Sequence, residues 1–256
     1  MQLTPDQKRQ FVEQGFLRLP GVIPPERVEA ARKLVNHHLG QGFDAEQRAI
    51  FAAQSYFPEL REHPDIKGLM EETPAYGLAE QLTAPGELLP VWRGQMALRF
   101  PMLEPSTKVL GGHIDGTPSP TNGVPPGTIY SFTMLAGVAL SDVRREDAGN
   151  FTVWPGSHLK LQEWFQTHDL MDLLDGAPRL DYGPPHQVQW EAGDLMLAHY
   201  QLLHGIAPNY SGDIRYAVFF RLHHVEHKGN EAACVRDIWR EWKGLAAYAQ
   251  DLVTGA

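Results

Sequence analysis

Residues 193–220 read GDLMLAHYQLLHGIAPNYSGDIRYAVFF, and this stretch decides the fold class. Two apolar runs, rich in β-branched and aromatic residues, flank a turn that contains Pro208 and Gly212. Residue types of this kind at these positions predict two strands joined as a β-hairpin. His204 ends the first run and Arg215 opens the second. We therefore expect these two side chains near facing ends of the hairpin.

The rest of the chain after residue 90 has the same character, with short strand-like runs between Gly, Pro and Asp clusters. The other runs are QMALRF, TIYSFTMLAGVAL, NFTVW and HQVQW. One predicted helix, LQEWFQTHDLMDLL (161–174), interrupts them. Helices at both ends around about seven strands predict a mainly β fold, a β-sandwich or jelly roll with helical cover.

The helical parts lie at the two ends of the sequence. LTPDQKRQFVEQG (3–15) begins at an N-cap, Thr4, and stops at Gly15. We expect one domain over 1–256, in which 1–90 is mostly helical, 91–225 forms the jelly-roll core and 226–256 is a C-terminal helix. Both terminal helical parts are expected to pack on the sheet.

Composition limits the classes of partner. The net charge of −9 argues against nucleic acid or an anionic membrane surface, because both attract a basic stripe. The single cysteine, Cys234, rules out an intrachain disulfide and fits a reducing compartment. No run of about eighteen apolar residues or signal core is present. We expect a soluble cytoplasmic protein that acts on a small molecule.

A histidine and an aspartate two residues apart occur in GGHIDGTPSP (111–120). In a strand, residues i and i+2 point the same way, so His113 and Asp115 can offer an imidazole and a carboxylate to one ion. With His204 as third ligand, two histidines and one carboxylate leave a face open, the arrangement that suits non-haem Fe(II). A second His-x-Asp, at 63–65, contains a proline and is interpreted as a surface turn.

An arginine among apolar residues is the other unusual feature. Arg215 shares one face of its predicted strand with Ala217 and Phe219. A guanidinium in such surroundings indicates an anion, and its planar fork suits a carboxylate. The alternatives are a structural ion pair for Arg215 and, for His204, a core histidine bonded to a carbonyl. His199 is a weaker ligand candidate because it lies within the strand.

Together these residues resemble the phytanoyl-CoA dioxygenase family of Fe(II)/2-oxoglutarate oxygenases. His113-Ile114-Asp115 matches the family's proximal metal pair, and GDLMLAHYQLLHG resembles its strand with the distal histidine. EDAGNFTVWPGSH (146–158) is similar to the family's Asn-Gly stretch that ends in Pro-Gly-Ser-His, although Ala148 replaces the asparagine. PNYSGDIR matches the family's Asn-x-Ser-x-x-x-Arg, which ends at the arginine of the 2-oxoglutarate site.

The resemblance implies a double-stranded β-helix (jelly roll, cupin-like) in which His113, Asp115 and His204 hold Fe(II). Arg215 would bind the distal carboxylate of the cosubstrate 2-oxoglutarate. O2 would be consumed, succinate and CO2 released, and a C–H bond of the substrate oxidised. Relatives that halogenate have a small residue at the position of Asp115, so its carboxylate favours hydroxylation, desaturation or ring closure.

Two departures from the family bear on the cosubstrate pocket. Gly137 stands where relatives often have a tryptophan, and Ile206 stands where many have a serine that helps bind 2-oxoglutarate. We therefore expect Thr133 and Gln95 to supply the remaining polar contacts. The irregular segment 116–127 is a candidate lid or substrate wall, or else a passive loop.

Some readings stay open at this point. RLHHVEHKG (221–229) holds three histidines, interpreted as a strand end rather than a second metal site because no cysteine and only Glu226 lie among them. Trp239 and Trp242 are spaced as on a helix that packs on the sheet. The alternatives to the oxygenase are a cupin-like metalloenzyme without 2-oxoglutarate and a non-catalytic jelly-roll ligand-binding protein.

Overall fold

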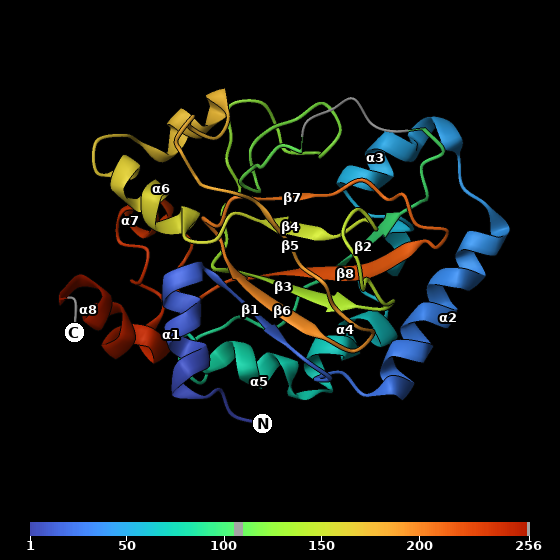
Figure 1. Cartoon of the computed structure of the whole chain (residues 1–256), viewed down its shortest axis with the longest axis horizontal. Helices are drawn as coiled ribbons and strands as arrows, with labels where there is room; N and C mark the ends of the chain where they lie inside the picture. Colours follow the sequence, from blue (N-terminus) through green and yellow to red (C-terminus); the bar gives the residue numbers. More distant parts are fainter. Residues whose placement is uncertain (105–109, 255–256) are drawn as a thin grey trace.

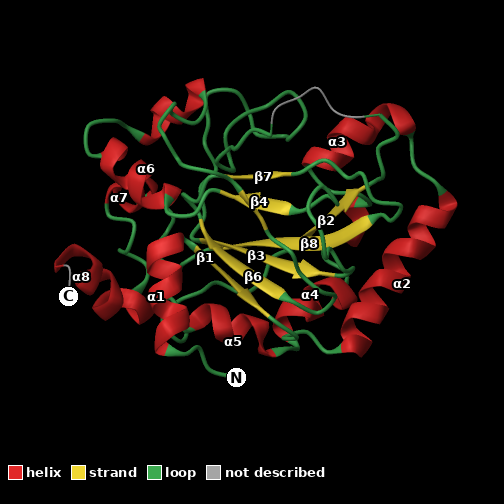
Figure 2. Cartoon of the chain, viewed as in Figure 1, coloured by secondary structure: helices red, strands yellow, loops and turns green. Residues whose placement is uncertain are grey.

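The computed structural model describes residues 1–104 and 110–254, and within them two antiparallel β-sheets lie among helices (Figure 1 and Figure 2). The larger sheet has five strands in the order β1-β6-β3-β8-β2 and the smaller has three in the order β5-β4-β7. The strands of the larger sheet are β1 Phe16–Leu19, β6 Leu195–His199, β3 Met134–Ala139, β8 Arg215–Leu222 and β2 Gly94–Arg99. Those of the smaller are β5 His186–Gln187, β4 Phe151–Val153 and β7 His204–Ile206.

The central strand β3 is buried on both faces, which is why its sequence is apolar without alternation. Met134, Ala136 and Val138 belong to a core shared with the helices. Leu135 faces a second core between the two sheets. Across that second core the rings of Phe151 (β4) and Phe219 (β8) lie 5.4 Å apart, so the sheets pack face to face.

Helices cover the outer face of the five-stranded sheet (Figure 1). They are α1 Pro5–Gln14, α2 Pro25–Gln41, α4 Pro64–Glu71 and α5 Pro74–Glu80, and the short helix α3 Arg48–Ala53 lies beside the edge strand β2. Helix α1 has the expected ends: the Thr4 hydroxyl accepts from the N–H of Gln7, and Gly15 closes the helix with φ 81°. Of the helices in the described chain, none combines the length and apolarity needed to cross a bilayer.

The N-terminal part also supplies β1, a strand that we did not predict. Residues 16–19 pair with β6 in antiparallel register and so complete one side of the sheet. The His63-Pro64-Asp65 segment forms the start of α4, where the His63 side chain accepts from the N–H of Asp65. Its local role agrees with the interpretation as a surface feature rather than a ligand pair.

The single helix predicted over 226–256 is wrong. The structure has α7 Glu231–Arg236 and α8 Ala246–Thr254, with an irregular segment and a short 3-10 turn between them. The reason is burial: Trp242 packs against Phe11 and His199, while its neighbour Glu241 is buried beside Thr133. These tertiary contacts override local helix propensity.

The helix predicted over 161–174 is likewise divided. Helix α6 spans Ser157–Phe165, and a 3-10 helix, Leu170–Asp175, follows after a break. The Asp169 side chain caps the second piece, with the capping box completed by Asp172. Asp169, a residue suited to the N-cap of a helix, therefore lies inside the helix predicted over 161–174.

The fold gives one prediction about packing. A Cβ added at the buried Gly94 would lie 2.6 Å from Ile66 Cγ2 and 2.7 Å from Val218 Cγ1. Gly94→Ala should therefore lower the free energy of unfolding by about 1–3 kcal/mol, the usual cost of overpacking. Gly40→Ala is the matched control, because its added Cβ meets nothing within 4 Å on the exposed side of α2. Urea denaturation should find Gly40→Ala neutral or stabilising by up to about 1 kcal/mol; equal losses in both variants would contradict the packing argument.

Candidate metal centre

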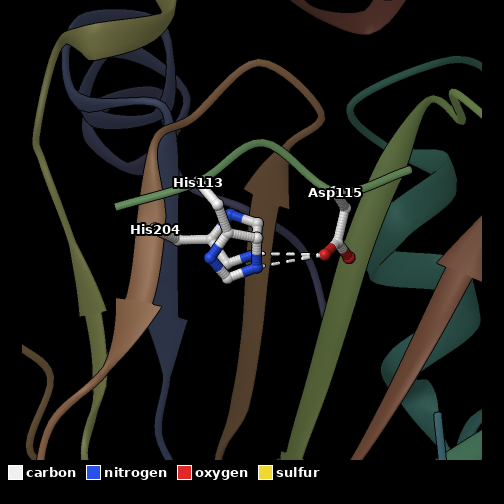
Figure 3. A group of neighbouring side chains, drawn as sticks. All are labelled: His113, Asp115 and His204. Atoms are coloured by element: carbon white, nitrogen blue, oxygen red, sulfur yellow. Dashed lines mark ion pairs between the residues drawn. The ribbon is translucent and has the colours of Figure 1, made fainter. Parts of the chain in front are cut away.

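A pair of backbone hydrogen bonds joins the segment before loop 116–127 to β7. The N–H of His113 donates to the carbonyl of His204 (2.8 Å), and the N–H of His204 donates back to the carbonyl of His113 (3.1 Å). Directly opposed residues in an antiparallel pair place their side chains side by side. The two imidazole rings consequently lie with centroids 4.6 Å apart (Figure 3).

The carboxylate of Asp115 points at both imidazoles (Figure 3). Its Oδ1 lies 3.3 Å from His113 Nε2 and 3.6 Å from His204 Nε2. The three candidate ligand atoms all lie within 4.8 Å of one another, a spacing that lets one ion contact all three. The structure thus brings together the three residues that the sequence selected from distant positions.

His204 is held in position from two sides. Its Nδ1 lies 2.9 Å from the carbonyl of Leu202, so a neutral ring carries its proton there and turns the Nε2 lone pair toward Asp115. The ring of Phe151 stacks on the imidazole at 5.2 Å. The side chain of His204 is 8% exposed and that of His113 is 55% exposed, so the site opens to solvent beside His113.

Arg221 binds the other oxygen of Asp115. Its Nε and Nη2 donate to Oδ2 at 3.1 and 2.7 Å, and its Nη1 donates to Gln95 Oε1 at 2.9 Å. Burial alone would raise the pKa of Asp115, but Arg221 and the two histidines outweigh it and hold this pKa well below its usual range. Oδ2 is therefore engaged, while Oδ1 remains free for a cation.

Arg215 lies at the opposite end of the same strand face, buried in the core between the sheets. Its Nε donates to the carbonyl of Gly149 (2.8 Å) and its Nη1 to that of Ala97 (2.9 Å). Its Nη2 is buried and has no hydrogen-bond partner among the described residues. A buried donor without an acceptor costs about 1–3 kcal/mol, so this position fits an absent acceptor group.

The surroundings of Arg215 favour an anion. Burial and the nearby charge of Arg99 lower the pKa of Arg215 well below the usual arginine value. No ion pair within residues 1–104 and 110–254 involves Arg215, which argues against the alternative of a structural ion pair. Gly149 has φ +77°, and a Cβ there would lie 3.0 Å from Arg99 Cβ. Glycine therefore allows its carbonyl to approach the guanidinium.

The space beside Gly137, where relatives often have a tryptophan, is filled from β8. A Cβ at Gly137 would lie 2.8 Å from Cε1 of Phe219, which is its partner across the two strands. Ala217 and Phe219 lie between Arg215 and Arg221 on the inner face of β8. An apolar wall thus separates the two arginines.

Thr133 and Gln95, the other predicted cosubstrate contacts, are engaged elsewhere. The Thr133 hydroxyl donates to Glu241 Oε2 (2.6 Å) and accepts from the N–H of His224 (2.8 Å), in a cluster apart from Arg215. Thr133 lies just before Met134, which pairs with Leu222 at the end of β8 away from Arg215. Gln95 accepts from Arg221 and donates to the carbonyl of Ala53 (3.3 Å). Gln95 therefore supports Arg221, a site residue that we missed although it shares strand parity with Arg215.

Loop 116–127 is tied to itself and to α3. The Asn122 side chain donates to the carbonyl of Thr117 (2.7 Å) and accepts from the N–H of Ser119 (3.0 Å). Gln54 of α3 donates to the carbonyl of Thr121 (2.8 Å). These contacts place a bonded loop next to the candidate ligands, and its role as a lid stays a prediction.

The competing histidine, His199, belongs to the core. Its Nε2 lies 3.1 Å from the carbonyl of Ile238, its Nδ1 accepts from the N–H of Gln201, and its ring stacks on Trp242. Burial lowers the pKa of His199 to about 4. Burial, with a smaller effect of His199, lowers the pKa of neighbouring His158 to about 3. Both rings are therefore neutral packing groups where β6 meets the helices.

The comparisons with known proteins agree with this geometry. The model of the phytanoyl-CoA dioxygenase (PhyH) family matches residues 11–217, a span that contains the three candidate ligands and Arg215. The chain belongs to this family. Its members are non-haem Fe(II)/2-oxoglutarate-dependent enzymes, so iron and 2-oxoglutarate are the cofactor and cosubstrate. No curated protein matched the sequence.

Solved structures have the same fold at low sequence identity. The non-haem α-ketoglutarate-dependent carbocyclase SnoK from nogalamycin biosynthesis is 22% identical, with 90% of this chain and 91% of that chain covered and a TM-score of 0.57. HygX from Streptomyces hygroscopicus, with nickel, 2-oxoglutarate and hygromycin B bound, is 20% identical over 88% of each chain, with a TM-score of 0.56. The non-haem monooxygenase ThoJ in complex with nickel is 19% identical, with 86% and 77% covered and a TM-score of 0.55.

The buried histidines predict how stability depends on pH. The folded-state pKa values of His158 and His199, about 3 and about 4, lie below the ordinary value of 6.5. Below pH 6.5 the unfolded chain therefore binds more protons than the folded one. The free energy of unfolding should fall as pH decreases from 6.5 toward 4, by up to about 1.4 kcal/mol per pH unit for each histidine.

Urea denaturation at several pH values checks this dependence. His158→Gln should flatten the slope between pH 6.5 and 4.5, whatever it does to stability at pH 7. The control is His37→Gln, which changes an exposed histidine of α2 and should leave the slope as in the wild type. An unchanged slope in His158→Gln would show that His158 is not held neutral by burial.

Proposed function

We propose that this single-domain protein is a 2-oxoglutarate-dependent dioxygenase that hydroxylates an unactivated C–H bond of a small organic substrate and releases succinate and CO2. One observation carries the proposal. The buried Arg215 has an Nη2 donor that no residue in the described part of the chain accepts, and the same strand leads from it to Arg221, which binds the carboxylate of the candidate metal triad. A cosubstrate with a chelating end and a carboxylate end suits this arrangement.

Each residue has a separate task in this proposal. His113 Nε2, His204 Nε2 and Asp115 Oδ1 would hold Fe(II) on one side, which leaves the other side open. Arg215 would bind the distal carboxylate of 2-oxoglutarate through Nη2, since Nε and Nη1 already bond carbonyl groups. Fe(II), 2-oxoglutarate and O2 together supply the oxidising power for the C–H bond.

The chain's own side chains provide orientation and shelter. Phe151 and Phe219 form an apolar wall next to His204, which keeps water from that side of the site. Arg221 keeps Asp115 ionised and turned toward the histidines. The half-exposed His113 marks the side from which a substrate approaches.

The two facing sheets are, in this proposal, the halves of a double-stranded β-helix. The TM-scores of 0.57 with SnoK and 0.56 with HygX support this architecture. HygX was crystallised with hygromycin B and SnoK comes from nogalamycin biosynthesis, which supports a natural product as the substrate class. The Asp115 carboxylate, with the family pattern, supports hydroxylation rather than halogenation.

Anaerobic titration tests the role of Arg215. Fe(II) and then 2-oxoglutarate should give a visible metal-to-ligand charge-transfer band in the wild type. Arg215→Met should raise the dissociation constant of 2-oxoglutarate by about 10–100-fold, the effect of losing a charge-assisted hydrogen bond. The matched control is Arg144→Met, because the Arg144 side chain is 68% exposed and pairs only with surface acids. A band that Arg215→Met leaves unchanged would remove Arg215 from the cosubstrate site.

Arg221 gives a second prediction. Arg221→Gln should weaken Fe(II) binding by about 10–100-fold, the effect of losing a group that orients a metal ligand. The Fe(II) affinity of Arg221→Lys should lie between those of Arg221→Gln and the wild type, since lysine keeps the charge but not the paired donors. Equilibrium dialysis measures the affinity, and Arg93→Gln, which changes an exposed arginine stacked on Trp92, is the control. Equal Fe(II) affinity in Arg221→Gln and the wild type would exclude this positioning role.

A further inference from the structure

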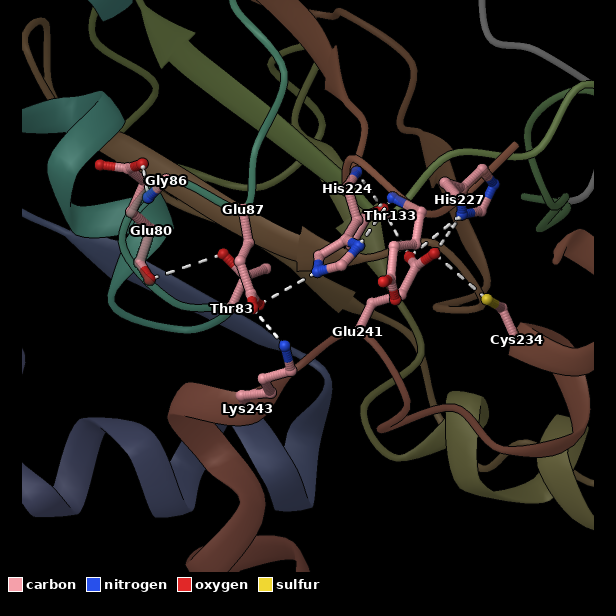
Figure 4. A network of polar contacts seen from close by, with 11 residues as sticks. Glu80, Thr83, Gly86, Glu87, Thr133, His224, His227, Cys234, Glu241 and Lys243 are labelled. Atoms are coloured by element: carbon pink, nitrogen blue, oxygen red, sulfur yellow. Dashed lines mark hydrogen bonds and ion pairs between the residues drawn. The ribbon is translucent and has the colours of Figure 1, made fainter. Parts of the chain in front are cut away.

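A second cluster of ligand-type side chains forms where the C-terminal segment meets the sheet (Figure 4). His227 follows β8, Cys234 lies on α7, and Glu241 lies in the irregular segment after α7. No local pattern joins these three residues, because no cysteine lies among the histidines of 221–229. The fold brings the chain's single cysteine and a glutamate to His227.

The ligand-type atoms converge. His227 Nδ1 lies 2.9 Å from Glu241 Oε1 and 3.0 Å from Oε2, and Cys234 Sγ lies 3.2 Å from Oε1. All three groups place one such atom within 4.8 Å of the others. His227 and Glu241 are each 4% exposed and Cys234 is half-buried, so surface coincidence does not explain the cluster.

Hydroxyl groups of neighbouring residues hold the remaining polar atoms of His227 and Glu241. His227 Nε2 lies 2.8 Å from the hydroxyl of Ser131, and Glu241 Oε2 accepts from the hydroxyl of Thr133 at 2.6 Å. Metal-binding histidines and carboxylates commonly have their other polar atom held by such partners, which aim the ligand atom at the ion. Ser131 and Thr133 hold His227 and Glu241 in this way.

There is also space beside the cluster. A cavity of about 10 Å³, roughly the room that one water needs, is lined by His227, Cys234 and Glu241. Tyr200 lines it too, and the buried Tyr200 hydroxyl has no partner within the described part of the chain. A water molecule in this cavity would supply a fourth ligand to an ion and a hydrogen-bond partner to Tyr200.

We propose that His227 Nδ1, Cys234 Sγ and Glu241 Oε1 bind a Zn²⁺ ion, with water as the fourth ligand. One sulfur, one nitrogen and one oxygen form a donor set that suits zinc and its tetrahedral geometry. A thiolate and a carboxylate together balance the charge of the ion, which is required in a buried site. The site is separate from His113, Asp115 and His204, and it does not depend on the proposed oxygenase activity.

The proton balance of binding is simple. The Cys234 thiol releases its proton to solvent when its sulfur binds the ion. A neutral His227 moves its proton from Nδ1 to Nε2, where it is donated to Ser131 Oγ. The ion then takes the place of the thiol and imidazole protons that now point at Glu241. Zinc affinity should accordingly increase with pH.

The bound ion would join three parts of the chain. His227 follows β8, Cys234 lies on α7, and Glu241 lies in the irregular segment after α7. Helix α7 contacts α6 and, through Val235, the core between the sheets. The ion would thus fasten the C-terminal segment to the sheet that carries Arg215.

Cobalt is the probe for this site, because Co²⁺ replaces Zn²⁺ and gives a near-ultraviolet charge-transfer band when a thiolate binds it. Cys234 is the only cysteine, and His113, Asp115 and His204 contain no sulfur, so the band reports this cluster alone. Titration of the full-length protein should give the band with an end point at one equivalent of thiolate-bound cobalt. Cys234→Ala should abolish it, and Asp115→Asn should keep it.

The other ligands are tested by the same band. His227→Gln and Glu241→Gln should each weaken cobalt binding at least tenfold, and Thr133→Val should weaken it by about 10–100-fold through Glu241. Circular dichroism identifies any variant that does not fold. If His227→Gln or Glu241→Gln does not fold, Cys234→Ala decides instead, because Cys234 is only half-buried. Cys234→Ala should then bind less zinc per chain than the wild type. Wild-type protein without the band, or a band unchanged in both His227→Gln and Glu241→Gln, would overturn the proposal.

Discussion

The reciprocal hydrogen bonds between the backbones of His113 and His204 are the contact on which the candidate metal centre depends. They join two segments that are 91 positions apart (204 minus 113) and set both imidazoles on one side. Asp115 follows two residues later and reaches the same point. The placement of the two imidazoles is therefore a consequence of backbone pairing, and Arg221 holds the Asp115 carboxylate beside them.

Strand β8 links this centre to the candidate cosubstrate site. Its inner face carries Arg221, Phe219, Ala217 and Arg215 in sequence, with one arginine at each end. The two arginines differ in their hydrogen bonds: Arg221 binds Asp115, while Arg215 keeps one donor that none of the described residues accepts. Strand β8 thus holds two guanidinium groups at a fixed separation: one is paired with a carboxylate, and the other has a donor that no described residue accepts.

The sequence was sufficient where local patterns carry the information and insufficient where contacts are long-range. The His-x-Asp spacing and the strand end at His204 selected residues whose side chains the fold brings together, and the polar residue in an apolar strand selected Arg215, which is buried on the strand that also carries Arg221. Thr133 was misjudged because parity does not fix the position along a strand: it lies next to Met134, which pairs with Leu222 at the end of β8 away from Arg215. The C-terminal helix was misjudged because burial of Glu241 and Trp242, which no local pattern indicates, interrupts it.

Strand β1 has a consequence for how the chain can be shortened. It is only four residues long, it lies at the edge of the five-stranded sheet, and Arg18 on it pairs with Asp194 at 2.7 Å. Short, charged edge strands discourage association between sheets of different molecules. A truncation that removes β1 would leave the apolar β6 backbone unpaired and offer it as a template for aggregation. The N-terminal segment is therefore a protective border of the sheet as well as part of its core.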